Sequence, residues 1–181
     1  MESRLLQKPS ACALPVTMRR FAIIAALPLA LSTPAGARES LGVFGGWGAF
    51  RDAEGPRCYA IAEPARRSGT NASWRAFASI GNWPTKGMRG QVQVRLSRER
   101  RANATVTLGI GDRRFPLAGG AADAWAADRR ADAAIIAAMR SGSSMSVASV
   151  DTHGRPFADV YPLRGAATAI DAAALGCARR D

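Results

Sequence analysis

Cys58 and Cys177 have the most reactive side chains of the chain after residue 37, and their number and spacing limit the chemistry available to them. A structural zinc site takes four cysteine or histidine ligands, and a thioredoxin-like redox centre needs two cysteines separated by two residues. The sequence offers neither, because these cysteines lie far apart and His153 is the single histidine. In an oxidising compartment two thiols most simply form one bridge. We therefore predict a Cys58–Cys177 disulfide and neither a metal nor another cofactor.

The residues near the N-terminus predict export to such a compartment. A short basic patch at 18–20 is followed by an apolar run at 21–31 and by a small-residue triplet at 35–37. This is the layout of a secretory signal peptide that is cleaved after Ala37, and the apolar run is too short to span a bilayer. We expect the mature protein to be in the periplasm, or to be secreted or carried to the cell surface.

The chain is expected to divide at that cleavage point. Residues 1–17 have no periodicity, so we expect translation to start at Met18 and residues 18–37 to form the signal peptide. Cys12 would then be absent from the mature protein. A lipid anchor on Cys12 is the alternative, but no hydrophobic stretch precedes this residue. Residues 38–181 contain no linker and no internal repeat, and they are expected to form one β-rich domain.

A hydrolytic site would have to use His153, which follows Asp151 by two residues. The nucleophile of a serine hydrolase often lies in a Gly-x-Ser-x-Gly turn, and the serine-rich segment 141–146 lacks the closing glycine. The glycine motifs that bind phosphates or dinucleotides are also missing. We therefore predict an exposed histidine in a turn and no enzymatic activity. A small periplasmic hydrolase that uses His153 is the alternative function.

Alternation of polar and apolar residues predicts antiparallel strands with one solvent-exposed face. The alternation is unbroken at 91–97 and at 105–110, and the charged segment 98–103 between them predicts a hairpin turn. The other segments with strand character are 43–51, 58–63, 74–80, 144–150 and 157–163. The polar segment 151–156 between the last two predicts a second hairpin.

Two helices are expected late in the chain. Within 128–140 the large apolar residues and one alanine recur at three- or four-residue spacing, as in a helix with one apolar face, at Ala131, Ile135, Ile136 and Met139. Asp128 is the expected N-cap and Gly142 the expected end of this helix. The alanine-rich segment 166–175 predicts a second helix that ends at Gly176. Together these segments predict a mainly β fold, an antiparallel β-sandwich or curled sheet with two helices late in the chain.

Positive charge is the strongest compositional signal. The formal net charge is +11, and +8 remains without residues 1–37, which hold 4 of the 25 basic and 1 of the 14 acidic residues. Arginine suits phosphate and carboxylate groups. We expect a partner that is an anionic envelope component, a host-surface molecule or another protein, and we do not expect nucleic acid. The alternative is that base composition favours arginine and that the domain is purely structural.

One loop is predicted to contact a partner. Most tryptophans of a small β-rich domain fill the core, and this chain has four, at Trp47, Trp74, Trp83 and Trp125. The segment 81–90 is the exception, because its glycines and Pro84 predict a loop. A tryptophan exposed in a loop suggests a contact. We predict a partner-contact loop that contains Trp83, Lys86 and Arg89.

Four segments together resemble one protein family, namely "FGGWGAF" (44–50), "RCYAIAE" (57–63), "AIIAAMRSGSSMSV" (134–147) and "YPLRGAATAIDAAALGC" (161–177). They resemble the invasion associated locus B family, secreted proteins of alphaproteobacteria named for a member linked to host-cell entry. Phe50 and Arg51 stand where the family pattern has its first cysteine, so the chain resembles a cysteine-poor member. The resemblance implies a periplasmic or surface-exposed β-rich domain without established catalytic residues. We therefore expect an exported, non-catalytic envelope protein that acts as a binding or accessory module.

Overall fold

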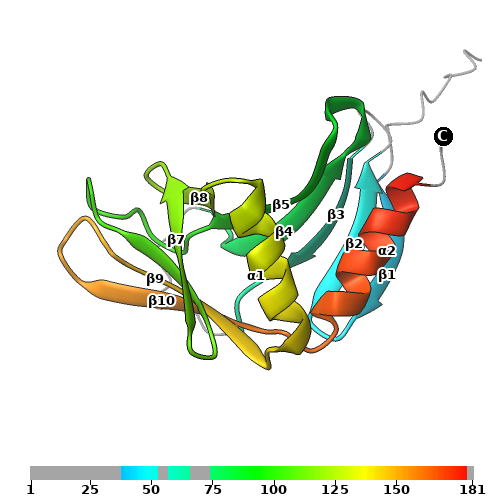
Figure 1. The fold of residues 1–181 in the computed structure, drawn as a ribbon. Coiled ribbons are helices and arrows are strands. Elements are labelled where there is room, and N and C mark those ends of the chain that lie inside the picture. The colour runs from blue at the N-terminus through cyan, green and yellow to red at the C-terminus, as the bar shows by residue number, and fades with distance from the viewer. Residues whose placement is uncertain (1–37, 53–56, 66–73, 179–181) are drawn as a thin grey trace, which may run out of the picture. The chain divides into compact units, whose positions relative to one another are not determined.

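A computed structural model of the chain describes residues 38–52, 57–65 and 74–178. The expected signal peptide, Cys12 and two pairs of adjacent arginines, Arg66–Arg67 and Arg179–Arg180, lie outside the described residues. Within these ranges the chain forms ten strands, two α-helices and one short 3-10 helix. The prediction of a mainly β fold with two helices late in the chain is confirmed (Figure 1).

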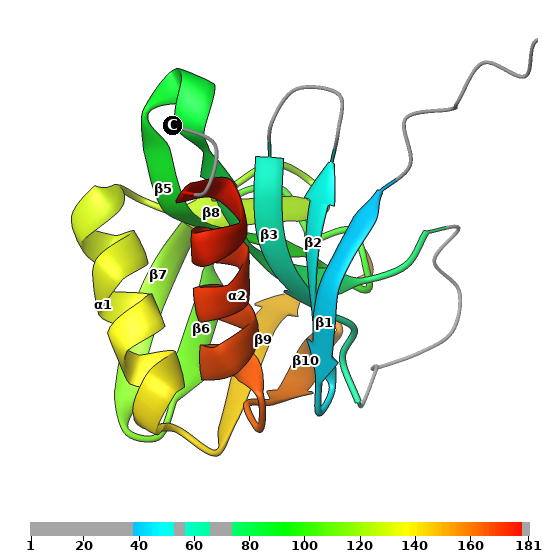
Figure 2. The same ribbon diagram turned by 90° about the vertical axis from the view of Figure 1, so that its right-hand side faces the viewer.

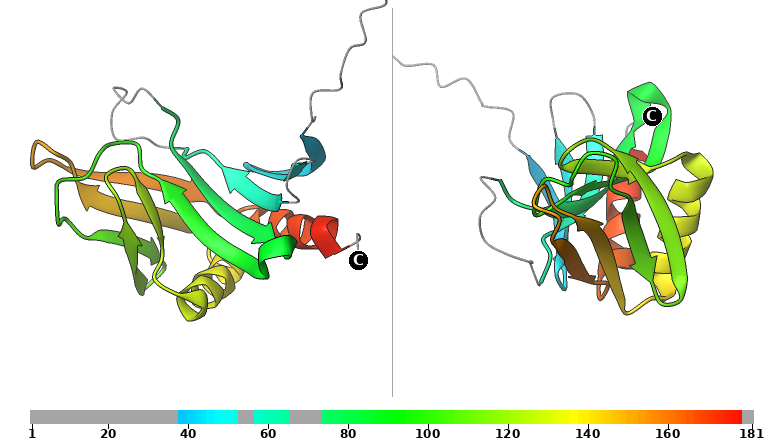
Figure 3. Two further views of the ribbon diagram at one scale, coloured as in Figure 1. Left: turned by 90° about the horizontal axis from the view of Figure 1, so that it is seen from above. Right: turned by 90° about the vertical axis from the view of Figure 1, so that its left-hand side faces the viewer.

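The strands belong to one antiparallel sheet, which is not closed. In chain order they are β1 (Glu39–Phe44), β2 (Trp47–Asp52), β3 (Arg57–Ala62), β4 (Phe77–Trp83), β5 (Met88–Arg95), β6 (Val106–Ile110), β7 (Arg113–Gly119), β8 (Asp123–Ala126), β9 (Ser144–Val150) and β10 (Pro156–Pro162). Across the sheet the order is β1-β2-β3-β4-β5-β8-β7-β6-β9-β10. The structure therefore has a single curled sheet, which was one of the two predicted forms (Figure 3).

Both helices, α1 (Arg129–Ser141) and α2 (Ala166–Ala178), cover the same side of the sheet (Figure 2). Alternate residues of a strand share a face, and the register shows which face is covered. Cys58 lies opposite Asn82, and Ala60 opposite Ile80, which in turn lies opposite Val92. All five side chains are buried beneath the helices, so one hydrophobic core lies between this face and the helices.

The helix α1 confirms the predicted start and end signals. The carboxylate of Asp128 accepts a hydrogen bond from the backbone N–H of Ala131 at 2.7 Å, which is the geometry of an N-cap. The helix ends at Gly142, whose N–H donates to the carbonyl of Ala138. Its inward face buries Ile135, Ala138 and Met139. The periodicity in the sequence thus predicted the face that joins the core.

One strand prediction near the start of the domain is wrong in detail. The segment 43–51 was predicted as one strand, but it spans the turn between β1 and β2. Gly45 at this turn has a φ of 60°, and a Cβ here would lie 2.5 Å from the carbonyl oxygen of Arg164. Only glycine fits both the left-handed backbone and this close approach. The apolar residues on both sides of the turn masked it in the sequence.

The predicted hairpin at 98–103 is also wrong. β5 pairs with β4 and β8, whereas β6 pairs with β7 and β9, so these consecutive strands are not neighbours. β7 and β8 were missed, because β7 contains Pro116 and ends in glycine and β8 is only 4 residues long. The helix α2 also continues past Gly176, where a Cβ would meet Leu41 at 2.4 Å. This glycine serves close packing against β1 and does not end the helix.

Candidate functional site

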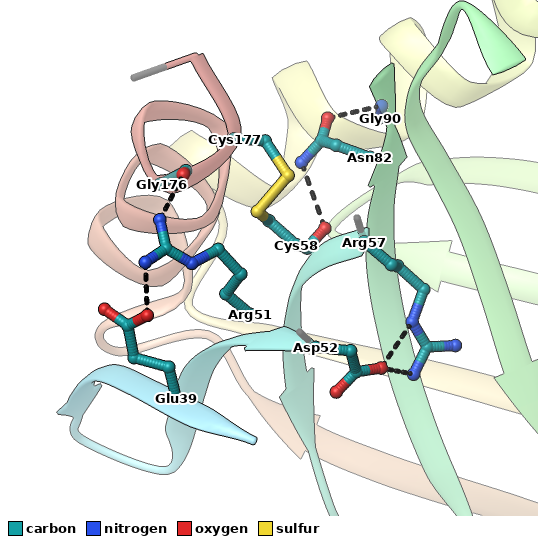
Figure 4. The surroundings of a disulfide bond; sticks show 9 residues. All are labelled: Glu39, Arg51, Asp52, Arg57, Cys58, Asn82, Gly90, Gly176 and Cys177. Carbon is teal, nitrogen blue, oxygen red and sulfur yellow. Dashed lines mark hydrogen bonds and ion pairs between the residues drawn. A yellow bond between two sulfur atoms is a disulfide. The ribbon is translucent and has the colours of Figure 1, made fainter. Parts of the chain in front are cut away.

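Cys58 and Cys177 form a disulfide, with their sulfur atoms 2.03 Å apart and their Cα atoms 5.7 Å apart (Figure 4). Cys58 is the second residue of β3 and points to the face that α2 covers, while Cys177 lies in the last turn of α2. Both side chains are buried. The bond is the one predicted from the cysteine count. Since both sulfurs are used in it, neither is a free thiol that could attack a substrate or bind a metal.

Arg51 joins the end of α2 to a second strand. Its Nη1 donates to the carbonyl of Gly176 at 3.1 Å, and its Nη2 pairs with the carboxylate of Glu39 (Figure 4). The last carbonyls of a helix have no partner within the helix, and a positive charge there is favourable. The C-terminal turn of α2 is therefore held by β2 as well as by the disulfide.

The buried Asn82 connects the disulfide to the base of the β4–β5 hairpin. Its Nδ2 donates to the carbonyl of Cys58 at 3.4 Å, and its Oδ1 accepts from the N–H of Gly90 at 3.0 Å (Figure 4). Asn82 lies at the bulge in the β4–β5 pairing, where the register shifts between Gly81 and Trp83. The amide thus bonds backbone groups on both neighbouring strands and fixes the base of the hairpin.

The predicted partner-contact loop is the tip of this hairpin. After Trp83 the chain makes a single 3-10 turn, Pro84–Lys86, and Gly87 closes it by donating its N–H to the carbonyl of Pro84 at 2.9 Å. Residues 84–87 and Arg89 are exposed, whereas Trp83 is partly buried. The structure therefore brings Trp83, Lys86 and Arg89 to one tip, with the tryptophan at its base.

Trp83 is held against the sheet on one side. A Cβ at Gly81 would lie 2.4 Å from its ring, so the glycine provides the space that the indole occupies. The guanidinium of Arg57 lies 5.9 Å from the Trp83 ring and 4.3 Å from the ring of Tyr59, within the range of cation–π attraction. Burial raises the pKa of Tyr59, and the nearby carboxylate of Asp52 raises it further. These contacts orient the indole while part of it stays exposed.

Four basic residues belong to the two segments that meet at this tip, and we call them the cationic end: Lys86, Arg89, Arg129 and Arg130. The first two belong to the hairpin and the other two begin α1. Arg129 donates from Nη2 to the carbonyl of Gly87 at 3.4 Å, so its side chain reaches from the first turn of α1 to the hairpin tip. Within the described ranges, none of the four forms an ion pair with a carboxylate.

The two carboxylates closest in sequence to the start of α1 are bonded to backbone groups. Asp128 caps the helix, and Asp132 accepts from the N–H of Val92 at 2.8 Å. Burial raises the pKa of Asp132, the Val92 hydrogen bond lowers it, and the charge of Asp128 raises it again. Counting both carboxylates, the group of six residues keeps a net charge of +2. The cationic end is therefore a positive surface, and it lacks the ion pairs seen elsewhere in the domain.

Most of the other described arginines form an ion pair with a carboxylate. Arg38, Arg75, Arg140 and Arg155 are exposed, yet each pairs with a carboxylate at 2.6 to 3.2 Å. In the Arg140–Asp171 pair, which joins the two helices, the guanidinium lowers the pKa of Asp171. Their charges are largely neutralised by these partners.

His153 lies exposed in the turn between β9 and β10. Its Nδ1 is 3.3 Å from the hydroxyl of Thr152, the preceding residue. Within the described part of the chain, no serine hydroxyl forms a hydrogen bond with His153. The nearby Asp151 does not orient the imidazole, because it accepts a hydrogen bond from the backbone N–H of His153. The arrangement needed for a serine hydrolase is therefore not formed around this histidine.

Asp151 instead organises the β9–β10 turn. Burial acts to raise the pKa of its carboxyl, but the N–H groups of Arg155 and His153 and the guanidinium groups of Arg98 and Arg155 outweigh it and lower the pKa to about 2. The Arg98 and Arg155 contacts measure 2.9 and 3.0 Å. Because Arg98 follows β5 in the chain, Asp151 ties the turn to a distant segment.

Acid should therefore weaken the fold through Asp151. A pKa lowered in the folded state means that the carboxylate stabilises the fold above its ordinary pKa of 3.8, and that this stabilisation is lost as the pH falls toward about 2. We expect the stability difference between the native protein and D151N to be full at pH 5 and to shrink between about pH 4 and pH 2. Urea unfolding at each pH measures it. D112N, at an exposed carboxylate with no ion pair in the described ranges, is the control, and an unchanged D151N difference across this window would contradict the assignment.

No three His, Cys, Asp or Glu side chains of the described residues are close enough together to hold a metal ion. In the same ranges, neither α-helix combines the length and the apolar character that crossing a membrane requires.

Comparison with known proteins identifies the family. The model of the family described as "Invasion associated locus B (IalB) protein" matches residues 49–174, which is well over half of the chain. The chain belongs to the invasion associated locus B family. No curated protein sequence matches it. Among solved structures, the crystal structure of invasion associated protein b from Bartonella henselae is similar, with a TM-score of 0.50 and 15% identity over 77% of this chain and 98% of that chain.

The family match and the shared fold confirm the resemblance seen in the sequence. The matched region of this invasion associated locus B family member includes Cys58, the β4–β5 hairpin and the start of α1, and it ends before Cys177. Sequence reasoning named the hairpin residues but missed Arg129 and Arg130. Their adjacency in sequence to the N-cap Asp128 was visible, but only the fold shows that this helix begins beside the hairpin tip.

Proposed function

We propose that this protein is an exported, non-catalytic accessory module of the cell envelope that binds an anionic partner through the cationic end. The partner is an envelope component or a molecule of a host surface. Export is supported by the signal-peptide pattern in the sequence, by the disulfide, which is stable in oxidising compartments, and by membership of the invasion associated locus B family.

One observation carries the proposal: the segments that bear the four basic residues of the cationic end meet at the hairpin tip, and within the described residues none of the four pairs with a carboxylate. An unpaired arginine or lysine keeps its full attraction for an external anion, whereas a paired one must first lose its partner. Arg129 and Arg89 are 40 residues apart in sequence, and the segments that hold them are joined by the Arg129–Gly87 hydrogen bond. The fold thus concentrates positive charge at one point of the surface, which raises the local concentration of anions.

The position of His153 supports a binding role over the hydrolase alternative. The imidazole is exposed in a turn and contacts Thr152, with Asp151 engaged by backbone N–H groups and arginines. This geometry favours a structural role for the β9–β10 turn over a catalytic one.

A pull-down from envelope extracts tests the proposal. The immobilised exported protein should retain envelope material at low salt and release it near 1 M salt, where the screening length falls to about 3 Å. The variant K86Q/R89Q/R130Q should retain at least about thirtyfold less, because three charges of the cationic end are lost.

The matched control, R101Q/R113Q/R164Q, removes three exposed arginines that lie on other loops and strands and should bind as the native protein does. Equal losses in both triple variants would mean that overall charge, and not the cationic end, governs retention. Retention of nothing at low salt would favour the purely structural alternative.

A further inference from the structure

We propose that the partner of the cationic end is the surface of an anionic phospholipid bilayer, which the protein contacts with the tip of the β4–β5 hairpin. The inference rests on the proposed anion-binding function and names its partner. The contact is peripheral: lipid headgroup phosphates meet Lys86, Arg89, Arg129 and Arg130, while the indole of Trp83 lies at the level of the headgroups.

The shape of the tip suits a broad surface. The hairpin projects at the end of the molecule where α1 begins (Figures 1 and 2). All residues from Pro84 to Gly87 are exposed, and the 3-10 turn buries none of its side chains. The cations of the hairpin tip and of the first turn of α1 can contact several lipid headgroups at once, because they lie on a projecting part of the surface. Attraction of this kind falls off within a screening length, so it requires the direct approach that a projecting tip permits.

Trp83 distinguishes a bilayer from other anionic partners. The indole N–H of Trp47 donates to Pro162 at 2.9 Å and that of Trp74 donates to Leu96 at 2.8 Å. The N–H groups of Trp83 and of the partly buried Trp125 have no acceptor among the described residues, and of these two tryptophans only Trp83 lies at the hairpin tip. An indole that combines an apolar ring with a free donor is the side chain enriched at membrane–water interfaces. A soluble polyanion could bind the four cationic side chains, but it has no apolar region into which the indole ring could insert.

The tip is also held in position before any contact. The amide of Asn82, at the base of the hairpin in β4, bonds backbone groups of β3 and β5, and Arg129 bonds the carbonyl of Gly87 at the tip. Trp83 is supported by Gly81 on one side and by the guanidinium of Arg57 at 5.9 Å. Little ordering is therefore needed when the surface is met, which favours binding.

Sedimentation with lipid vesicles tests the inference. The exported protein should bind vesicles that contain about one third phosphatidylglycerol in phosphatidylcholine, and should not bind vesicles of phosphatidylcholine alone. K86Q/R89Q should weaken the partition onto the anionic vesicles about thirtyfold, because two cations near the surface are lost. The control R101Q/R113Q should leave the partition within about twofold.

Tryptophan fluorescence reports the orientation. The emission of the native protein should shift to shorter wavelength when anionic vesicles are added, and W83F should bind with the shift largely removed. A shift that persists in W83F would overturn the tip-first orientation. Vesicle binding that K86Q/R89Q leaves unchanged would overturn the placement of the site.

A polyphosphate resin separates this inference from the proposed function. If the protein binds the resin through Lys86 and Arg89 but ignores anionic vesicles, the bilayer inference is wrong and the anion-binding function stands. If it binds neither the resin nor the vesicles, both fail. Binding to vesicles that inorganic phosphate at millimolar excess does not displace supports the bilayer over a free phosphate ion.

Discussion

Replacement of both bridged cysteines, C58A/C177A, should lower the free energy of unfolding by about 4 to 5 kcal/mol. The bond joins residues 119 positions apart, so it closes most of the domain into one loop and removes much of the conformational freedom of the unfolded chain. A loss of this size is comparable to the whole net stability of many small domains, about 5 to 15 kcal/mol. Alanine is chosen because Cys58 is fully buried and a serine hydroxyl would need a partner there.

Urea unfolding with and without reductant measures the effect. The native protein should unfold at a much lower urea concentration after reduction under denaturing conditions, whereas reductant should leave C58A/C177A unchanged. Hydrogen exchange should locate the loosened part in α2 and the start of β3, because the bond joins these elements. An equal urea midpoint for oxidised and reduced native protein would show that the bridge contributes no stability.

The disulfide also bears on the candidate site. Asn82 bonds the carbonyl of Cys58 and the N–H of Gly90, so the base of the hairpin and the bridge share one buried amide (Figure 4). Loss of the disulfide should therefore change the orientation of the β4–β5 hairpin and loosen the end of α2. Under conditions in which C58A/C177A is folded, we expect this variant to bind material from envelope extracts more weakly than the native protein does.

Replacement of Trp47 by alanine should cost about 3 to 5 kcal/mol of stability. The indole is fully buried, and its N–H donates to the carbonyl of Pro162, which is 115 residues away. β2 and β10 lie near opposite ends of the sheet order, so this side chain joins the two ends of the curled sheet across the core. Its removal leaves a cavity and a carbonyl without its donor.

Two further variants show how much of the Trp47 effect comes from its hydrogen bond and how much from its burial. W47F keeps most of the volume but loses the N–H, and it should cost about 1 to 2 kcal/mol. W83A removes a partly exposed tryptophan and should cost about 1 kcal/mol or less. Urea unfolding of the three variants at neutral pH gives the order directly. Stability of W47A equal to that of W83A would contradict the role of Trp47 in closing the curled sheet.

Local chemistry in the sequence was enough to predict α1, β9 and β10. The alternation at 144–150 and 157–163 matches β9 and β10, and the spacing of Ile135 and Met139 predicted the buried face of α1. These features were predictable because periodicity, caps and turns act between residues that are close in the chain. Counting cysteines predicted the disulfide in the same way, since two thiols leave one pairing.

Pairing between distant segments was not predictable. β5 passes over its neighbour in sequence to pair with β8, and the choice depends on which hydrophobic faces the helices cover. At Gly45 the requirement for glycine comes partly from a distant group, the carbonyl oxygen of Arg164, and the local sequence does not show this contact. The failures at 43–51 and 98–103 thus have one cause, namely that contacts far apart in the chain set the local structure there.

The sequence by itself determined the mainly β class, the two late helices, the bridge partners and the basic character of the domain, since these follow from composition and from short-range patterns. Only the tertiary structure decided that the start of α1 meets the β4–β5 hairpin and that Lys86 and Arg89 join Arg129 and Arg130 there. The physical reason is that helix α1 takes its place by burying its apolar face against β5, and the charged residues of its first turn are carried along with it.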